Sequence, residues 1–104
     1  MFMRAVHPGE VLKDELDELG VTPTELARQI DVPPNRVSQI IAGKRAVTAD
    51  TDLRLCRFFG LSNGYWLRAQ AAYDTEVAED EQRKDADVDR WIAGMRRLRV
   101  SLEA

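Results

Sequence analysis

Two helix-start signals that lie close together place the strongest constraint on what this chain can fold into. Thr22 can cap the backbone amide of Glu25, whose carboxylate can reach back to Thr22, which is the pattern of a capping box. A second start follows at the proline pair of residues 33–34, because prolines are tolerated in the first turn of a helix but not in its interior. The sequence therefore predicts two short helices joined by a tight turn at residues 31–32.

Similar signals predict three further helices around this pair. One helix begins near Pro8 and ends at Gly20, and another follows Thr48 and ends at Gly60. A fifth helix follows Ser62. Because little in the sequence indicates a strand, we expect an all-α fold with a five-helix domain in residues 1–74.

The last thirty residues have a different pattern. Residues 74–89 carry eight acidic and two basic groups, and an apolar stripe at helical spacing follows them. This pattern predicts an acidic linker and an amphipathic C-terminal helix in residues 75–104, separate from the first five helices. The stripe is a candidate surface for a second copy of the chain or for another protein, and it consists of Val88, Trp91, Ile92, Met95 and Leu98.

The distribution of charge matters more for binding than the net charge of −3. Residues 28–73 carry seven basic and three acidic groups, a net charge of +4, whereas residues 1–27 carry two basic and six acidic groups, a net charge of −4. Exposed charges act locally because salt screens them over about 10 Å. The basic middle of the chain is therefore a candidate surface for nucleic acid.

Two short helices with a polar edge on the second are typical of a helix-turn-helix, whose second helix enters the major groove of DNA. Arginine matches guanine, and asparagine and glutamine match adenine, by paired donors and acceptors. We expect phosphate contacts from Lys44 and Arg45, which follow this helix directly. The predicted base-contacting residues are Pro34, Asn35, Arg36, Ser38 and Gln39.

Several runs of sequence resemble a known family. Residues 24–28 (Thr-Glu-Leu-Ala-Arg) and 37–45 resemble the Xre/Cro-type helix-turn-helix family. Residues 7–12 (His-Pro-Gly-Glu-Val-Leu), 50–55 and 66–74 resemble HigA-type, VapI-like antitoxins more narrowly.

The resemblance implies a protein that binds a RelE-like ribonuclease toxin and represses its own operon. Carried over by position, it places Thr22 and Thr24 at phosphates and Pro34, Asn35 and Gln39 at bases. At Pro34 the family often has a polar residue, so a weaker base contact is expected there. At Asp52 it usually has a small apolar residue.

Other functions remain open at this point. A stand-alone repressor without a toxin would have the same helix-turn-helix, and so would a protein-interaction module that no longer binds DNA. We expect a homodimer on a palindromic site, because a single recognition helix reads only a few base pairs. Trp66 and Tyr73, which share one face of the fifth helix, are the candidate dimer contacts.

Catalysis, cofactors and metals find little support in the sequence. The single histidine, His7, and the single cysteine, Cys56, lie far apart without a metal-binding pattern, and no glycine-rich phosphate loop is present. We expect His7 to be a helix cap or a surface residue and Cys56 to be a core residue. Because no run is apolar enough to cross a bilayer and the first ten residues lack the features of a signal peptide, we expect a cytoplasmic protein.

Overall fold

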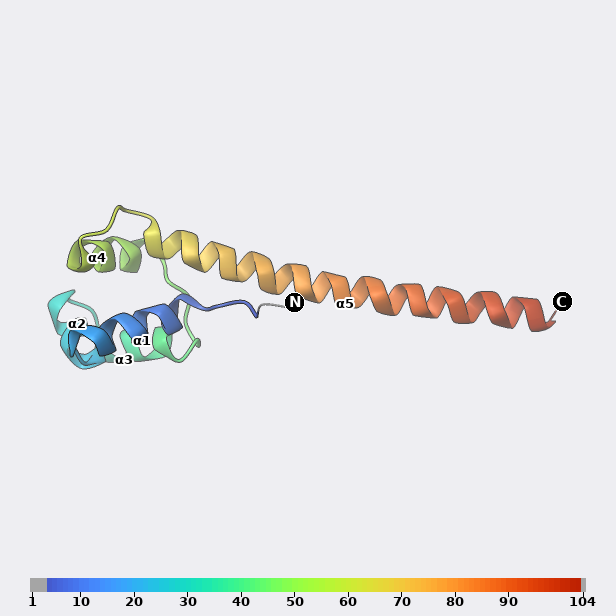
Figure 1. Cartoon of the computed structure of the whole chain (residues 1–104), viewed down its shortest axis with the longest axis horizontal. Helices are drawn as coiled ribbons and strands as arrows, with labels where there is room; N and C mark the ends of the chain where they lie inside the picture. The colour runs from blue at the N-terminus through green and yellow to red at the C-terminus, as the bar shows by residue number, and fades with distance from the viewer. Residues whose placement is uncertain (1–3, 104) are drawn as a thin grey trace. The chain divides into compact units, whose positions relative to one another are not determined.

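The computed structural model describes residues 4–103, with side-chain environments for residues 4–98. The ordered elements in this range are all helices: α1 (Pro8–Leu19), α2 (Pro23–Gln29), α3 (Pro34–Ile41), α4 (Ala49–Phe59) and α5 (Tyr65–Glu103) (Figure 1). The expected all-α helix-turn-helix architecture is confirmed. Residues 1–74 and residues 75–104 form two separate compact units.

Local capping explains four of the boundaries of α1, α2 and α4. The Thr22 hydroxyl accepts from the amide of Glu25, at 3.1 Å, and the Thr48 hydroxyl accepts from the amide of Thr51, at 3.4 Å. Gly20 and Gly60 end α1 and α4 in the left-handed conformation, with φ of 67° and 69°. These four boundaries lie where the sequence predicts them.

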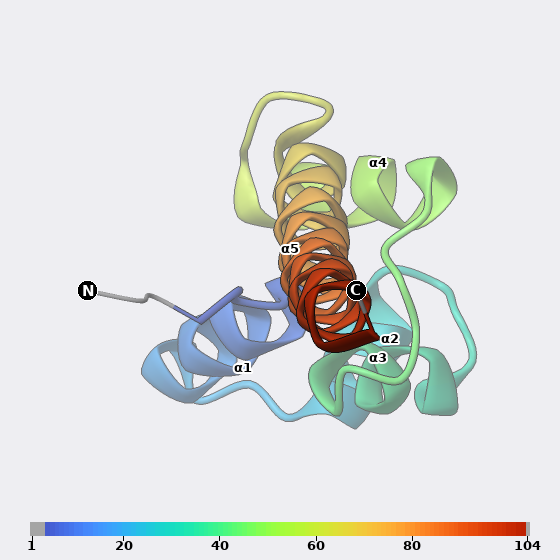
Figure 2. The ribbon, with the colours of Figure 1, turned by 90° about the vertical axis from the view of Figure 1, so that its right-hand side faces the viewer.

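The core of the first unit lies where α1, α2 and α3 meet α4 and the first turns of α5. Figures 1 and 2 show α2 and α3 packed beside α1, and α4 beside the beginning of α5. All five helices contribute side chains that are almost fully buried, among them Leu12, Leu16, Leu26, Ala27, Val37, Ile40, Leu55, Cys56 and Trp66. The expectation that Cys56 is a core residue is confirmed.

The predicted fifth helix and the predicted C-terminal helix are one helix, α5, which is 39 residues long. The expectation of a linker and a separate helix is therefore wrong at the level of secondary structure. Residues 74–93 contain no proline or glycine, and Arg83 donates to Asp80 one turn away at 2.8 Å, which supports a helix through the acidic segment. Among residues 4–103, no helix combines the length and the apolar character needed to cross a membrane.

Candidate nucleic-acid interface

The turn between α2 and α3 sets the geometry of the candidate interface. Asp31 adopts a left-handed conformation with φ of 57°, which asparagine and aspartate tolerate better than most residues do. The amide of Val32 then donates to the carbonyl of Ala27, at 3.0 Å, and the chain enters α3. At the start of α2, the Glu25 carboxylate accepts from the Thr22 hydroxyl instead of the Thr22 backbone amide, so the predicted capping box forms only in part.

The outer edge of α3 carries the five predicted base-contacting residues. Pro34, Asn35 and Ser38 are exposed, whereas Arg36 and Gln39 are partly buried. The Ser38 hydroxyl donates back to the carbonyl of Asn35, at 3.2 Å. The Asn35 side chain is the more exposed of the two amide side chains on this edge. The Ser38 hydroxyl already has an acceptor within α3.

Arg36 has a partner within the chain. Its guanidinium lies 3.9 Å from the carboxylate of Asp50 at the start of α4, and its side chain is 30% exposed. The sequence predicts only an outward-pointing arginine. To contact a base, the Arg36 guanidinium would have to give up its ion pair with Asp50 or bind the base and Asp50 together.

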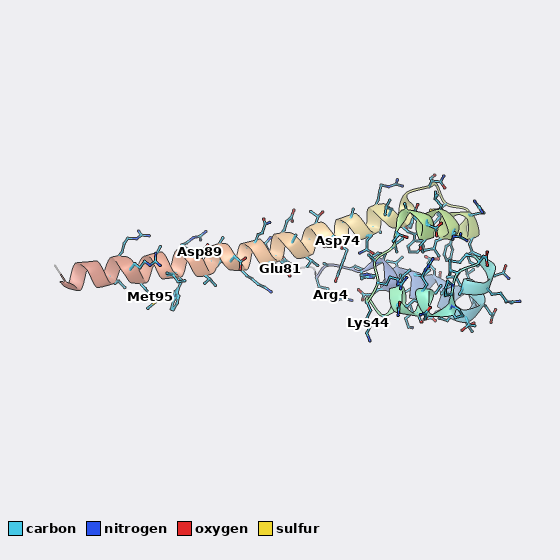
Figure 3. The ribbon with its side chains drawn as sticks, turned by 180° about the vertical axis from the view of Figure 1, so that it is seen from behind. Arg4, Lys44, Asp74, Glu81, Asp89 and Met95 are labelled. Carbon is cyan, nitrogen blue, oxygen red and sulfur yellow. The ribbon has the colours of Figure 1, made fainter. Side chains whose placement is uncertain are left out.

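The predicted phosphate-contacting residues surround this edge. Thr22 and Thr24 are exposed at the first turn of α2, although the Thr22 hydroxyl is engaged in its cap. Lys44 and Arg45 are exposed directly after α3. Figure 3 shows the Lys44 side chain extending outward from the end of α3, so it is free to meet a phosphate.

An arginine on α4 stabilises the turn, a role that the sequence does not predict. Arg54 donates to the carbonyl of Ile30 at 2.9 Å and to that of Asp31 at 3.3 Å, and it also donates to the Asp50 carboxylate at 3.0 Å. These contacts satisfy carbonyls at the end of α2 and link α4 to the turn between α2 and α3. Asp50 and Arg54 are four residues apart and so can be recognised as a helical pair, but nothing in the sequence indicates the carbonyl partners.

The His-Pro-Gly run at the start of α1 brings α1 against α3. The His7 ring accepts from the amide of Gly9, at 2.9 Å, and the Glu10 carboxylate accepts from the amide of His7, which completes a capping box. The expectation that His7 is a cap is confirmed, although its side chain is buried. A Cβ on Gly9 would lie 1.9 Å from the carbonyl oxygen of Ile40, so only glycine allows this approach to the recognition helix.

Asp52 caps α5 from a distance. Its carboxylate is buried and accepts from the amides of Gly64 at 2.7 Å, Trp66 at 2.8 Å and Leu67 at 3.0 Å. Burial alone would raise the pKa of the Asp52 carboxyl, but these bonds and one from the Cys56 thiol outweigh it and hold the pKa below its ordinary value. Asp52 is therefore a structural anchor of α5, where the resemblance implies a small apolar side chain.

The two candidate dimer contacts are placed differently. Trp66 is 1% exposed inside the core of its own chain, so its ring has almost no surface to offer a second copy, and the expectation of a dimer contact is wrong for this residue. Tyr73 is partly exposed and packs edge-on against His7, with ring centroids 4.9 Å apart. Only Tyr73 remains a candidate.

The apolar stripe of the tail is uncovered. Its side chains are between 37% and 67% exposed, on the part of α5 where Met95 is labelled in Figure 3. Among the described residues, no group of three His, Cys, Asp or Glu side chains is arranged as a metal site.

Two short helices, a tight turn between them and an exposed polar edge on the second helix define the class of protein: a helix-turn-helix DNA-binding domain. The family model described as helix-turn-helix matches residues 12–66, just over half of the chain. Virulence-associated protein I of Dichelobacter nodosus is 43% identical over 81 residues, which cover 77% of this chain and 75% of that protein.

Solved structures give the same result. The HigA-family addiction module antidote protein of Coxiella burnetii matches with a TM-score of 0.77 and 43% identity, over 82% of this chain and 94% of that one. The Pseudomonas aeruginosa antitoxin HigA, solved with the higBA promoter, matches with a TM-score of 0.75 and 36% identity, over 80% of this chain and 91% of that one. The chain belongs to the Xre-type helix-turn-helix family, among the HigA-type and VapI-like proteins.

Proposed function

We propose that this protein is an antitoxin that binds operator DNA as a homodimer, represses its own operon and neutralises a RelE-like ribonuclease toxin. The observation that carries the proposal is the exposed edge of α3 followed by Lys44 and Arg45, in a chain 36% identical to an antitoxin solved with its promoter. On a palindromic site, the two α3 helices would lie about 34 Å apart, one turn of DNA. Tyr73 is the proposed dimer contact.

Binding to operator DNA is tested with substitutions on and beside α3. Asn35→Ala, Arg36→Ala and Gln39→Ala should each weaken specific binding by about 1–3 kcal/mol and relax preference at one base position per half-site. Lys44→Ala should weaken binding to every sequence and reduce the salt slope by about one. Arg83→Ala removes an exposed arginine from the tail and is the matched control. Equal losses on operator and random DNA for Asn35→Ala, Arg36→Ala and Gln39→Ala would contradict the proposal.

Toxin neutralisation is tested with the tail. We propose that the stripe of Val88, Trp91, Ile92, Met95 and Leu98 buries apolar area against the toxin, at about 25 cal/mol per Å², while the acidic segment of residues 74–89 faces its basic surface. Removal of residues 75–104 should leave DNA binding largely intact but reduce rescue of growth when the neighbouring toxin gene is co-expressed. Full rescue by the truncated protein would exclude this role, and loss of dimerisation would assign the stripe to the dimer.

The alternative is a stand-alone repressor with the same DNA-binding surface. The two functions are separated by the gene next to this one, since an antitoxin of this type requires a short basic toxin beside it. Absence of such a gene, together with retained operator binding, would favour the stand-alone repressor. A chain that is not retained on duplex DNA at low salt would instead favour the protein-interaction module.

A further inference from the structure

A small pocket lies in the first unit, between the end of α1, the end of α4 and the start of α5. Its lining residues are Glu15, Phe59, Leu61, Tyr65 and Trp66, and its volume is about 130 Å³. Pockets for small ligands and cofactors usually measure roughly 300 Å³ or more. This one (the aromatic pocket) therefore has room for a single side chain.

Two aromatic rings of the aromatic pocket pack on the third, that of Trp66. The ring centroids of Tyr65 and Trp66 lie 5.3 Å apart and those of Phe59 and Trp66 lie 5.6 Å apart, in T-shaped and tilted arrangements. Trp66 is held by the core, whereas Tyr65 is 44% exposed at the rim. Aromatic faces attract cations through the ring quadrupole, and arginine makes such contacts more often than lysine does.

The charge beside the rings favours the same occupant. Glu15 lines the aromatic pocket and makes no ion pair with any of the residues that the structure describes. It lies on the exposed face of α1 with Asp14 and Glu18, within residues 1–27, which carry a net charge of −4. A carboxylate beside aromatic rings matches a guanidinium, which can pair with the carboxylate and stack on a ring.

The Trp66 indole N–H can report on the aromatic pocket. It is buried and has no acceptor among the described residues. Because Trp66 lines the aromatic pocket, a cation that enters there should shift the resonance of this N–H.

We propose that the aromatic pocket receives an arginine side chain from a basic protein partner. The proposal rests on the proposed antitoxin function only for the identity of that partner, which would be the toxin. The aromatic pocket and the tail would then be two separate contact surfaces of the same chain, the one anchoring a single cationic side chain and the other burying apolar area.

The test uses the full-length protein and a defined probe, Nα-acetyl-L-arginine amide, followed by NMR through the Trp66 indole N–H. Trp91→Phe assigns that resonance. We expect a saturable shift with a Kd on the order of 1 mM, and a much smaller shift with the neutral isostere Nα-acetyl-L-citrulline amide. Glu15→Gln should weaken binding about fivefold, and Tyr65→Ala should weaken it as well. Glu18→Gln, which removes a charge from the same helix outside the aromatic pocket, should leave binding unchanged.

Three outcomes would overturn the proposal. Equal shifts with the arginine and the citrulline probe would exclude recognition of the charge. Equal losses of affinity in Glu15→Gln and Glu18→Gln would mean that the probe responds to the overall negative charge of α1 and not to Glu15 in the aromatic pocket. A Trp66 resonance that moves on dilution of the protein alone, and that stops moving in Arg96→Gln/Arg97→Gln, would make a second copy the occupant. Thermal unfolding of each variant establishes that it is folded.

A toxin arm separates this proposal from the proposed function. Glu15→Arg should reduce rescue of growth by the co-expressed toxin gene more than Glu18→Arg does, with operator binding retained in both variants. If the wild-type chain gives no rescue, the toxin function fails, and the arginine titration still decides the aromatic pocket. If rescue is equal in both variants, the toxin is not its occupant.

Discussion

Trp66 and Trp91 lie on the same helix, yet their surroundings are opposite. Trp66 is 1% exposed and packs with Phe59 and Tyr65, whereas Trp91 is 66% exposed. The same contrast divides the inner face of α5, since Trp66 and Gln70 are buried in its first turns, whereas the apolar side chains along residues 88–98 are uncovered.

The contrast shows that helical periodicity and burial are separate properties. In the first turns, Trp66, Gln70 and Tyr73 share one face that meets the domain: the Gln70 amide oxygen accepts from the amide of Val47 at 2.9 Å, and Tyr73 packs on His7. In the tail the periodicity is equally regular, but the described residues supply nothing to cover it. Stability in the first region rests on tertiary contacts, and in the tail it rests on helix propensity and pairs one turn apart.

The largest expected difference comes from truncating the two tryptophans. Trp66→Ala should lower the free energy of unfolding by about 3–5 kcal/mol, because it removes a fully buried ring. Trp91→Ala should change it by less than about 0.5 kcal/mol, because the ring is already in water. Denaturant unfolding followed by circular dichroism measures both, and Trp66→Phe serves if Trp66→Ala does not fold. A large loss in Trp91→Ala would mean that the tail is covered in solution.

The next difference concerns two aspartates on these regions. Asp52→Asn should lower the free energy of unfolding by about 1.5–3 kcal/mol at pH 7, since it removes a buried charge that accepts hydrogen bonds from three backbone amides. Asp80→Asn, which loses an exposed bond to Arg83, should cost no more than about 0.5 kcal/mol. Equal losses would contradict the anchoring role of Asp52.

Acid should remove the same contribution. Because the pKa of Asp52 is lower in the folded state than in the unfolded state, its stabilisation is present above the ordinary pKa of about 4 and is lost as the pH falls through the folded value. The difference in stability between the wild type and Asp52→Asn should therefore shrink on acidification below about pH 4. Thermal unfolding of both proteins between pH 7 and pH 2 measures this difference. A difference that stays constant over this range would contradict a lowered pKa of Asp52 in the folded state.

A further difference, in the sign of the effect, involves two glycines within helices. Gly9→Ala should destabilise the domain by about 1–3 kcal/mol, because the added Cβ meets the carbonyl oxygen of Ile40. Gly94→Ala should raise helicity and stabilise α5 by about 0.5–1 kcal/mol, since nothing lies within 4 Å of its Cβ. Circular dichroism and unfolding of the two variants test both signs, and a loss in Gly94→Ala would reveal a hidden contact in the tail.

The sequence predicts four boundaries of α1, α2 and α4 well because each depends on residues within four positions of it. Thr22, Thr48, Gly20 and Gly60 act through neighbouring amides and carbonyls, so their roles can be recognised in the chain itself. The sequence does not predict the continuity of α5, because a strongly acidic segment is typical of a solvated linker, although its residues also favour a helix.

The sequence alone determined the helix-turn-helix pair, the polar edge of α3 and the family, because these follow from local spacing and from short runs of residues. Only the tertiary structure decided that Arg54 stabilises the turn, that Asp52 caps α5, that Gly9 meets Ile40 and that Trp66 is a core residue. The contacts of Arg54, Asp52 and Gly9 join residues that lie between 12 and 31 positions apart in the sequence. A contact at such separation leaves no period or cap in the sequence, because it exists only after the helices have packed.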